Sequence, residues 1–383
     1  MGIILVVGFI SFPAMLVIVT AMMLRENQAC PAKNTRYLIY VLLGTALGYI
    51  NTTKPTEYSD IGYYFWLYNW ASTKTFSEYV DLIPKEPLFH IYNYVMSYLT
   101  FGNFKLFVVA TTVLMYLPVM LAFDKIIYEN KIESKYAIAA AVIFACFSEY
   151  FYYTAQIIRQ VLAGSLAFYF VVRMTYKNDK WSYIGLACTG LIHASAFVFC
   201  IYYILRFSVR WSLKVRLIVV LASFVLFGAI VGFVASMSDP DSTLAYAANR
   251  ALSGAGDVIH IGLLPLAVCA SIIPMALLIM QRLEWDTGIT NIMLLAVFLV
   301  VFVFANMSNP LFVLRFMEYC YIFLPICLVL SLYLLQLTRI IFLAIVIILF
   351  RFVMSLNKGD FQYEPFINIC IDGYPSMLFK ILE

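Results

Sequence analysis

Residues 288–305 read GITNIMLLAVFLVVFVFA, a run without a single charged side chain. A helix needs about 20 mainly apolar residues to cross the hydrocarbon core of a bilayer, so this run is suited to one crossing. The whole chain of 383 residues has the same character, because 64% of its residues are hydrophobic and only 12% are charged. A soluble domain carries about 25% charged residues, so the composition predicts an integral membrane protein and excludes a water-soluble fold.

Similar runs recur along the chain and predict an all-α polytopic membrane protein with ten to twelve transmembrane helices. The predicted spans are 3–24, 37–50, 106–123, 136–150, 157–174, 217–237, 261–280, 288–305, 311–335 and 339–355. Two stretches are ambiguous, because 88–101 is short and 181–205 has His193 near its middle, among small residues. If they do not cross, they are expected to be re-entrant or broken helices. We expect a single membrane domain over 1–383, with residues 3–24 kept as a helix.

Lys and Arg concentrate in the cytoplasmic loops of membrane proteins, and this rule orients the chain. The loops 25–36 and 206–216 are both rich in basic residues, and 206–216 has no acid, so both are predicted to be cytoplasmic. Both termini are then extracytoplasmic. The segments predicted to lie outside are 51–87, 238–260 and the tail 356–383. If neither ambiguous stretch crosses, Arg159 lies near the outer face, and the charge rule favours this arrangement.

The remaining composition excludes several classes of function. The basic residues are scattered among short loops, so the net charge of +4 predicts no nucleic-acid-binding surface. The eight Cys and three His show no metal-binding spacing, and most Cys lie in apolar runs. We expect no metal, no cofactor and no essential disulfide.

Arg159 is a charged residue that stands inside a predicted span. An ionisable residue there costs roughly 2.5–3.5 kcal/mol on insertion scales and marks a candidate site. Arg159 lies at the start of the span 157–174, between Gln156 and Gln160. A snorkelling Arg would turn its guanidinium to the nearest interface. The flanking amides favour a polar anion site instead.

Arg315 and His193 also lie within predicted spans. Glu318 follows Arg315 by one turn, so an ion pair within the helix is one interpretation of Arg315. A guanidinium that binds two phosphate oxygens is the other. His193 is either a hydrogen-bonded structural residue or a group that transfers protons.

The predicted outer loop 51–87 contains five acids and the aromatic run Tyr63-Tyr64-Phe65-Trp66. Aromatic rings are common anchors at the membrane surface, and rings beside carboxylates also hold sugar rings. Asp60 precedes the aromatic run and is the better candidate for a base beside a bound sugar. Glu86 precedes Pro87, where the dipole of a starting helix favours a carboxylate.

Two intramembrane Arg residues and carboxylates at one outer face suit a single reaction. A lipid-linked diphosphate would bind between Arg159 and Arg315, with a carbohydrate against the carboxylates and aromatic rings. The two Arg side chains would stabilise the departing diphosphate while a base takes the proton of an acceptor hydroxyl. The base stays open among Asp60, Glu86 and His193.

The order of these features resembles the EpsG and Wzy group of bacterial polysaccharide polymerases. The matching pieces in chain order are Ser59-Asp60 with Tyr63-Tyr64, Glu86-Pro87-Leu88-Phe89, Ile158-Arg159-Gln160-Val161-Leu162-Ala163, Ala187 with Ile192-His193-Ala194-Ser195-Ala196, and Arg315 with Tyr319. These pieces concentrate in residues 55–205, and the rest of the chain matches in hydropathy.

The resemblance implies a metal-independent membrane glycosyltransferase of C-type architecture at the outer face of the bacterial inner membrane. It would move a growing chain from undecaprenyl diphosphate onto the terminal sugar of a new lipid-linked unit, without a cofactor. A chain-length regulator is an implied partner. The implied site residues are Asp60, Glu86 and His193 for catalysis, Arg159, Gln160 and Arg315 for the diphosphate, and Tyr63, Tyr64, Arg250 and Tyr319 for other substrate contacts. In the loop 238–260, where many relatives carry more basic and Tyr residues, only Tyr246 and Arg250 remain.

Three other functions compete with the polymerase as interpretations of the sequence. A flippase or transporter of lipid-linked sugars predicts internal repeats with broken helices in matching halves, and the sequence shows no such symmetry. A membrane O-acyltransferase acting on the polysaccharide also uses a His and an Arg, but it needs an acyl donor from the cytoplasm. A structural or receptor protein is disfavoured by the Arg, His and Gln residues within spans.

Overall fold

The computed structural model describes residues 32–56, 60–81, 86–208, 262–283, 287–307, 309–357 and 374–382, with six isolated positions between 211 and 222. All regular secondary structure in these ranges is helical, which confirms the predicted all-α class for the described part of the chain. The chain divides into two compact units, one up to Phe197 and again from Leu332, the other Val198–Ser331. A single membrane domain over 1–383 stays a prediction.

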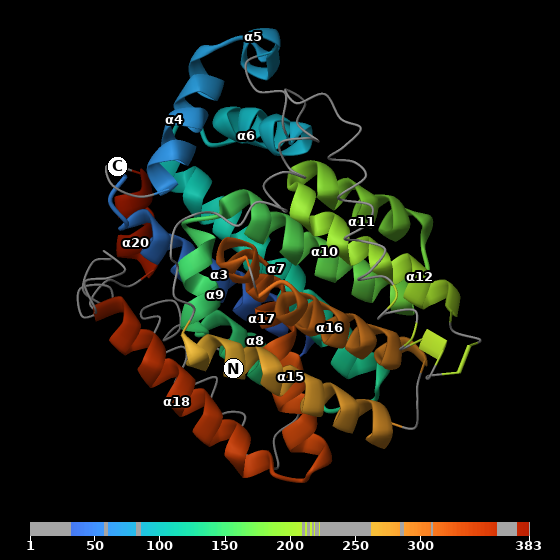
Figure 1. Ribbon diagram of the computed structural model, residues 1–383. Coiled ribbons are helices and arrows are strands. Elements are labelled where there is room, and N and C mark those ends of the chain that lie inside the picture. The colour runs from blue at the N-terminus through green and yellow to red at the C-terminus, as the bar shows by residue number, and fades with distance from the viewer. Residues whose placement is uncertain are drawn as a thin grey trace. The chain divides into compact units, whose positions relative to one another are not determined.

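The first unit is built around two long antiparallel helices that pack against each other, α3 (Lys33–Thr52) and α7 (Phe104–Glu129) (Figure 1). Its other helices are α4 (Asp60–Thr73), α5 (Phe76–Asp81), α6 (Pro87–Leu99), α8 (Lys135–Ala145), α9 (Ser148–Thr154), α10 (Ile158–Tyr176), α11 (Lys180–Ile192), α18 (Thr338–Asn357) and α20 (Tyr374–Leu382). Gly48 allows α3 and α7 to touch, because a Cβ there would lie 2.8 Å from the Cα of Val109. Asn51 then ties three helices together by donating to the hydroxyls of Thr112 (3.1 Å) and Thr154 (2.9 Å).

The opposite end of the α3–α7 pair holds a buried ion pair. Arg36 donates from Nε to Asp124 Oδ1 (2.6 Å) and from Nη2 to Oδ2 (3.0 Å), and the Tyr40 hydroxyl donates to Oδ1 at 3.3 Å. Arg36 was expected in a cytoplasmic loop. It instead lies in the first turn of α3 and is 7% exposed, because the fold supplies a carboxylate 88 positions further along the chain.

Helix α10 packs against α7, and α11 packs against α10 in the opposite direction. The amide of Asn130, just after α7, donates to the hydroxyl of Tyr176 at the end of α10 (3.0 Å), so α7 and α10 end together. Asp179 then caps α11 by accepting from the amide of Ser182 (2.9 Å) and also pairs with Arg173 (2.8 Å). α11 therefore starts where α10 ends and returns toward the start of α10.

Helix α6 lies at one end of this bundle, which we call the Arg159 end and define by the carboxyl end of α3 and the amino ends of α7 and α10. Glu86, just before α6, pairs with Arg159 at the start of α10, and Thr100, just after α6, leads into α7. Figure 1 shows α4, α5 and α6 grouped together there. Both ends of α6 thus lie at the Arg159 end, which agrees with the non-crossing arrangement that the charge rule favours for 88–101.

The second ambiguous stretch, 181–205, is interrupted at His193. α11 ends at Ile192, His193 has extended backbone (φ −155°, ψ 125°), and a 3₁₀-helix η1 (Ala194–Cys200) and α12 (Ile201–Phe207) follow. The predicted span 136–150 is broken as well, since α8 and α9 meet at an angle of 62°. The segment 51–87 is largely helical rather than a loop, because α4 and α5 fall within it.

The second unit contains α12, α15 (Leu263–Arg282), α16 (Thr287–Ala305) and most of α17 (Pro310–Leu334). α16 packs against both α12 and α15. Phe316 of α17 meets Phe302 of α16 edge to face, with ring centroids 4.9 Å apart, and stacks on Phe312 of its own helix, with centroids 4.2 Å apart. Arg216 donates to the side-chain oxygen of Asn291 on α16 at 3.0 Å.

Long apolar helices confirm a multi-pass membrane protein but not the number of crossings. Five described helices are long and apolar enough to span, namely α7, α15, α16, α17 and α18, and the bent pair α8–α9 would make a sixth. α3 and α10 match the predicted spans 37–50 and 157–174 but fall outside this set. The predicted span 3–24 and all but two positions of 217–237 lie outside the described residues, so ten to twelve crossings stays a prediction.

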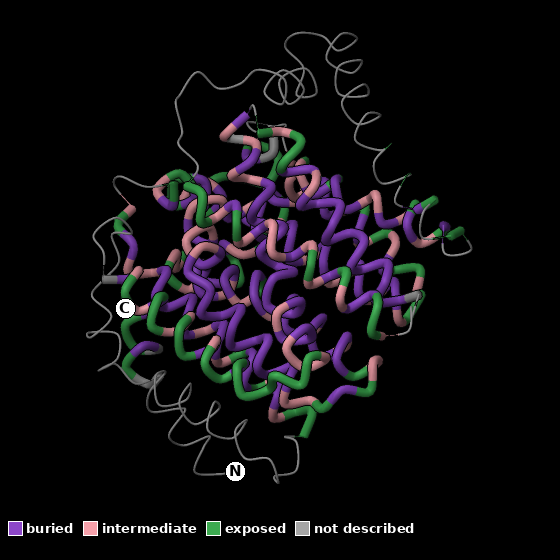
Figure 2. Tube along the Cα trace, turned by 60° about the horizontal axis from the view of Figure 1, so that its bottom comes forward, coloured by how far each residue is buried: buried purple, intermediate pink, exposed green. Residues whose placement is uncertain are grey.

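Figure 2 shows exposed positions along the outer sides of the helices. Many of the exposed residues are large and apolar. On α18 these include Leu343, Ile347 and Phe350, which are 54%, 56% and 65% exposed. A protein in water rarely exposes a continuous apolar stripe of this kind. We therefore assign the outer face of α18 to contact with lipid.

Candidate functional site

An unusual backbone turn at Glu86 positions its carboxylate. The Glu86 backbone is in the left-handed region (φ 59°, ψ 57°), which is unfavourable for a residue with a side chain and is found mostly at positions that the surrounding structure enforces. Pro87 follows as the first residue of α6, where its missing N–H costs nothing. This turn places the Glu86 carboxylate beside the start of α10.

Arg159 and Glu86 form an ion pair between Arg159 Nη1 and Glu86 Oε2. The pair is only partly shielded, since the side chains are 25% and 15% exposed. Arg159 Nε is buried and has no hydrogen-bond partner in the described part of the chain. The guanidinium is thus neither turned to solvent, as snorkelling would require, nor fully used by the carboxylate.

Three aromatic rings surround the Arg159 guanidinium. Its central carbon lies 5.8 Å from the ring centroid of Tyr63 and 5.9 Å from those of Tyr64 and Phe89. Contacts of this kind are favourable because the ring face is negative. Burial raises the pKa of the Tyr64 hydroxyl, and the neighbouring guanidinium opposes part of that shift.

His193 completes the group from the end of α11. Its Nε2 lies 3.4 Å from Glu86 Oε1, while its Nδ1 lies 2.6 Å from the Ser195 hydroxyl and accepts from the Ser195 backbone amide at 3.3 Å. A backbone amide can only donate, so Nδ1 is an acceptor and the ring proton is on Nε2. The neutral His193 therefore directs an N–H toward Glu86.

A row of exposed and half-buried rings continues away from Arg159 along α4. Tyr63 stacks with Trp66 (centroids 6.2 Å apart, planes at 27°), and Trp66 contacts Trp70 (4.1 Å). The side chains of Tyr63 and Trp66 are both 45% exposed. Rings left open beside a charged group provide flat apolar faces for a bound sugar.

The structure does not bring every predicted site residue into this group. Asp60 is exposed at the start of α4, and among the described residues no hydrogen bond or ion pair joins it to Glu86, Arg159 or His193. Gln160 follows Arg159 and is buried. The residues predicted in the loop 238–260, Tyr246 and Arg250, lie outside the described residues.

Arg315 belongs to the second unit. It is half-buried on α17, while Glu318 and Tyr319 are fully buried there. Tyr319 packs against Phe199 with ring centroids 5.1 Å apart. A diphosphate site shared by Arg159 and Arg315 stays a prediction.

Sequence reasoning missed a second histidine in this region. His90 lies one turn after Glu86 on α6, is fully buried, and has its Nδ1 3.2 Å from the hydroxyl of Tyr79, which in turn accepts from Asn93 (2.7 Å). These contacts fasten α5 to α6 and so support the turn at Glu86. The sequence signal was a His at helical spacing from Glu86, in a stretch too short to be a clear span.

Titratable groups in the described ranges do not gather into a metal site, since no three His, Cys, Asp or Glu side chains are grouped there. The three side chains of Glu86, Arg159 and His193, which we call the Arg159 group, lie together. They can bind an anion through the guanidinium, accept a proton on the carboxylate and donate a hydrogen bond from the imidazole.

Comparison with known protein families gives a match that covers most of the chain. The model of the EpsG family matches residues 36–368, a range that contains all of Glu86, Arg159, His193 and Arg315. No curated protein sequence matches the chain, and no solved structure does.

Proposed function

The chain belongs to the EpsG family, and we propose that it joins undecaprenyl-diphosphate-linked oligosaccharide units into a surface polysaccharide. Family membership indicates a membrane protein of the polysaccharide-polymerase type with a lipid-linked glycan as substrate. The finer proposal is carried by one observation: Glu86, Arg159 and His193, distant in sequence, meet beside exposed aromatic rings.

The Arg159 end is the extracytoplasmic end in this proposal. The Lys residues that follow α7 and α10, namely Lys131, Lys135, Lys177 and Lys180, lie toward the opposite end, where these two helices finish together. Basic residues favour the cytoplasmic side, so that end is placed inside. The site then faces the outside of the bacterial inner membrane, where the proposed substrate presents its sugars.

We assign the diphosphate of the donor to Arg159. A guanidinium has five N–H groups, and the Nε of Arg159 has no hydrogen-bond partner among the described residues. Phosphate oxygens are strong acceptors for such groups. A bound diphosphate therefore competes with Glu86 for the guanidinium.

The bond-forming step follows from this exchange. The acceptor hydroxyl oxygen bonds to the anomeric carbon of the donor sugar, the bond from that carbon to the diphosphate oxygen breaks with its electron pair, and the hydroxyl proton passes to Glu86. Arg159 stabilises the negative charge on the departing diphosphate. His193 keeps the carboxylate oriented by donating from Nε2, so it acts as a positioning residue in this assignment.

The direct test is chain elongation by the purified protein in detergent, with a synthetic lipid-linked repeat unit as the only substrate. Arg159→Ala is expected to slow the formation of longer products by about 100-fold or more. Arg173→Ala is not, because Arg173 lies on the same helix but pairs with Asp179 at the other end. Full-length polymer from Arg159→Ala would refute the assignment. Movement of the repeat unit across a membrane by wild-type protein, without elongation, would show a transporter instead.

A further inference from the structure

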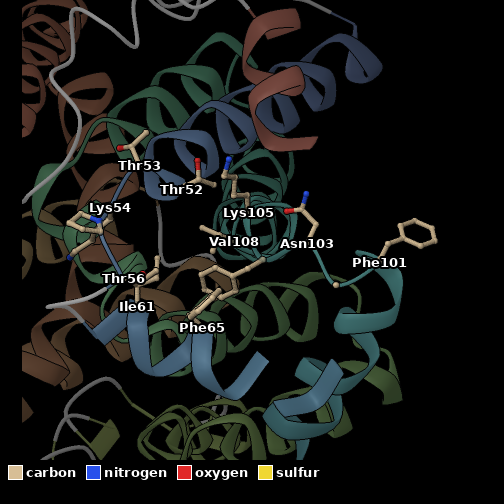
Figure 3. Close-up of a pocket in the computed structure, with 13 residues that line it drawn as sticks. Thr52, Thr53, Lys54, Thr56, Ile61, Phe65, Phe101, Asn103, Lys105 and Val108 are labelled. Atoms are coloured by element: carbon tan, nitrogen blue, oxygen red, sulfur yellow. The ribbon is translucent and has the colours of Figure 1, made fainter. Parts of the chain in front are cut away.

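A cavity of about 700 Å³ opens at the Arg159 end, separate from the Arg159 group. Figure 3 shows its walls: the loop after α3 with Lys54, the α4 residues Ile61 and Phe65, and the start of α7 with Asn103 and Lys105. The carbonyl oxygen of Thr56 can approach α4 closely, because a Cβ at Gly62 would lie 2.0 Å from it. The loop is thereby held against α4 to form one wall.

Both charged residues that line the cavity are lysines. The side chain of Lys54 is almost completely buried (4% exposed), and its ammonium lies 5.2 Å from the ring centroid of Tyr152. The Lys105 ammonium donates to the carbonyl of Lys380 at 3.0 Å. A buried ammonium such as that of Lys54 is costly, and Lys105 adds a second, exposed positive charge to the wall, so the cavity favours an anion inside it.

The start of α7 adds to the positive character of the cavity. α7 has 26 residues, and the Asn103 side chain caps it by accepting from the amide of Leu106 at 3.0 Å. The amides of Phe104 and Lys105 belong to the same first turn, whose N–H groups have no partner within a helix. Amides of this kind bind phosphate and similar anions readily.

The level of the cavity relative to the membrane indicates which molecules can supply the anion. α7 is one of the helices long and apolar enough to span, so its first residues lie where the chain leaves the hydrocarbon core. Lipid phosphates lie at that level. Phe101, which lines the cavity, is 93% exposed and can contact a lipid chain.

We propose that this cavity binds the phosphate or diphosphate group of a membrane lipid, independently of the Arg159 group. α4 separates the two sites, because Ile61 and Phe65 line the cavity whereas Tyr64 contacts Arg159. The phosphate would be held by Lys54, Lys105 and the start of α7. Two sources share this chemistry: a second lipid-linked repeat unit and an anionic phospholipid of the bilayer.

The experiment counts bound lipids on the purified full-length protein by native mass spectrometry, with two probes. Farnesyl diphosphate represents the lipid-linked diphosphate, and dioctanoyl phosphatidylglycerol represents the bilayer lipid. Lys105→Gln and the double variant Lys54→Gln/Lys105→Gln are expected to weaken at least one probe about tenfold or more, since each removes a charge-assisted contact. Lys74→Gln is the matched control, because Lys74 is exposed just after α4 and does not line the cavity.

The outcomes separate the sources. Weakening of farnesyl diphosphate alone identifies the lipid-linked substrate, weakening of phosphatidylglycerol alone identifies the bilayer lipid, and weakening of both shows that the phosphate is what is recognised. Lys105→Arg should restore binding if the charge is what matters. Unchanged binding of both probes, relative to Lys74→Gln, would overturn the proposal, as would loss of all binding in Arg159→Gln. Because no turnover is measured, the result does not depend on the polymerase assignment.

Discussion

Two Arg–carboxylate pairs lie at opposite ends of the first unit, and they differ in every respect that matters for function. Arg36 and Asp124 are joined by two hydrogen bonds with both side chains 8% exposed, and Tyr40 donates a third. Arg159 and Glu86 are more exposed, and Glu86 has left-handed backbone. We call the Arg36–Asp124 pair closed, because the carboxylate and guanidinium are joined by two hydrogen bonds away from solvent. We call the Arg159–Glu86 pair open, because Arg159 Nε still has no hydrogen-bond partner among the described residues. A charge inside the bundle is therefore structural or functional according to how completely its partner satisfies it.

The largest effect is expected at the closed pair. Arg36→Ala leaves Asp124 buried without its charge partner, which should lower the free energy of unfolding by about 3–5 kcal/mol. The measurement is thermal unfolding of the purified protein in one detergent. Arg351→Ala is the control, since Arg351 pairs with Glu149 at the surface and is 45% exposed, so its loss should cost about 1 kcal/mol or less. Equal destabilisation by the two variants would remove the distinction between closed and open pairs.

The open pair should show the reverse pattern. Arg159→Ala is expected to slow elongation by about 100- to 1,000-fold, because it removes a donor to the departing diphosphate. Its unfolding temperature should fall less than that of Arg36→Ala. If Arg159→Ala were the less stable of the two, the pair would be a structural one and its effect on elongation would have another cause.

Lys54 extends the comparison to a buried cation that faces a cavity. Burial lowers its pKa from 10.5 to about 8, and the nearby Asp60 opposes the shift. Phospholipid binding in the cavity should then weaken by up to about tenfold between pH 7 and pH 9, as the ammonium loses its proton. Lys54→Arg should abolish this pH dependence because its guanidinium stays charged. A wild-type affinity that is flat over this range would separate Lys54 from the phosphate.

The same pKa shift has a consequence for stability. The folded pKa lies below the unfolded one, so the unfolded chain binds more protons between pH 8 and 10.5. Lys54 therefore destabilises the fold below pH 8, and this contribution fades as the pH rises through that window. Lys54→Met should remove the dependence.

The smallest effect is expected at Ser195. Ser195→Ala removes the hydroxyl at His193 Nδ1 but keeps the backbone amide that fixes the ring proton on Nε2. Elongation should fall by only about three- to tenfold, the value of one hydrogen bond. His193→Phe removes both ring nitrogens and should cost more. Equal losses in the two variants would show that the hydroxyl, and not the tautomer, is what orients Glu86.

Much of the candidate site was predictable because charge is rare in this chain. Arg159, His193 and Glu86 stand out in or beside apolar runs, and the structure brings these three together. Their contact was not predictable from spacing, since it depends on a left-handed turn at Glu86 and on the break at His193. Asp60 was favoured as the base for its place before the aromatic run, but α4 begins there and leaves it exposed.

The fold was predictable in class but less so in detail. Apolar runs located α7, α15, α16, α17 and α18, because hydropathy alone decides such helices. Helices α4 and α5 were missed because their aromatic and polar residues give no clear apolar period. Arg36 was misread as a loop charge, since its partner Asp124 is far away in sequence. Lys54 was not singled out because burial depends on tertiary contacts.

The central claim is that Arg159 exchanges Glu86 for the diphosphate of the substrate. The most direct measurement compares lipid-linked repeat-unit binding and single-turnover bond formation in Glu86→Gln and Arg159→Gln. Glu86→Gln should bind at least as tightly as wild type, because no carboxylate competes for the guanidinium, and should form no glycosidic bond. Arg159→Gln should lose binding. Normal bond formation by Glu86→Gln, or a loss of binding equal to that of Arg159→Gln, would contradict the account.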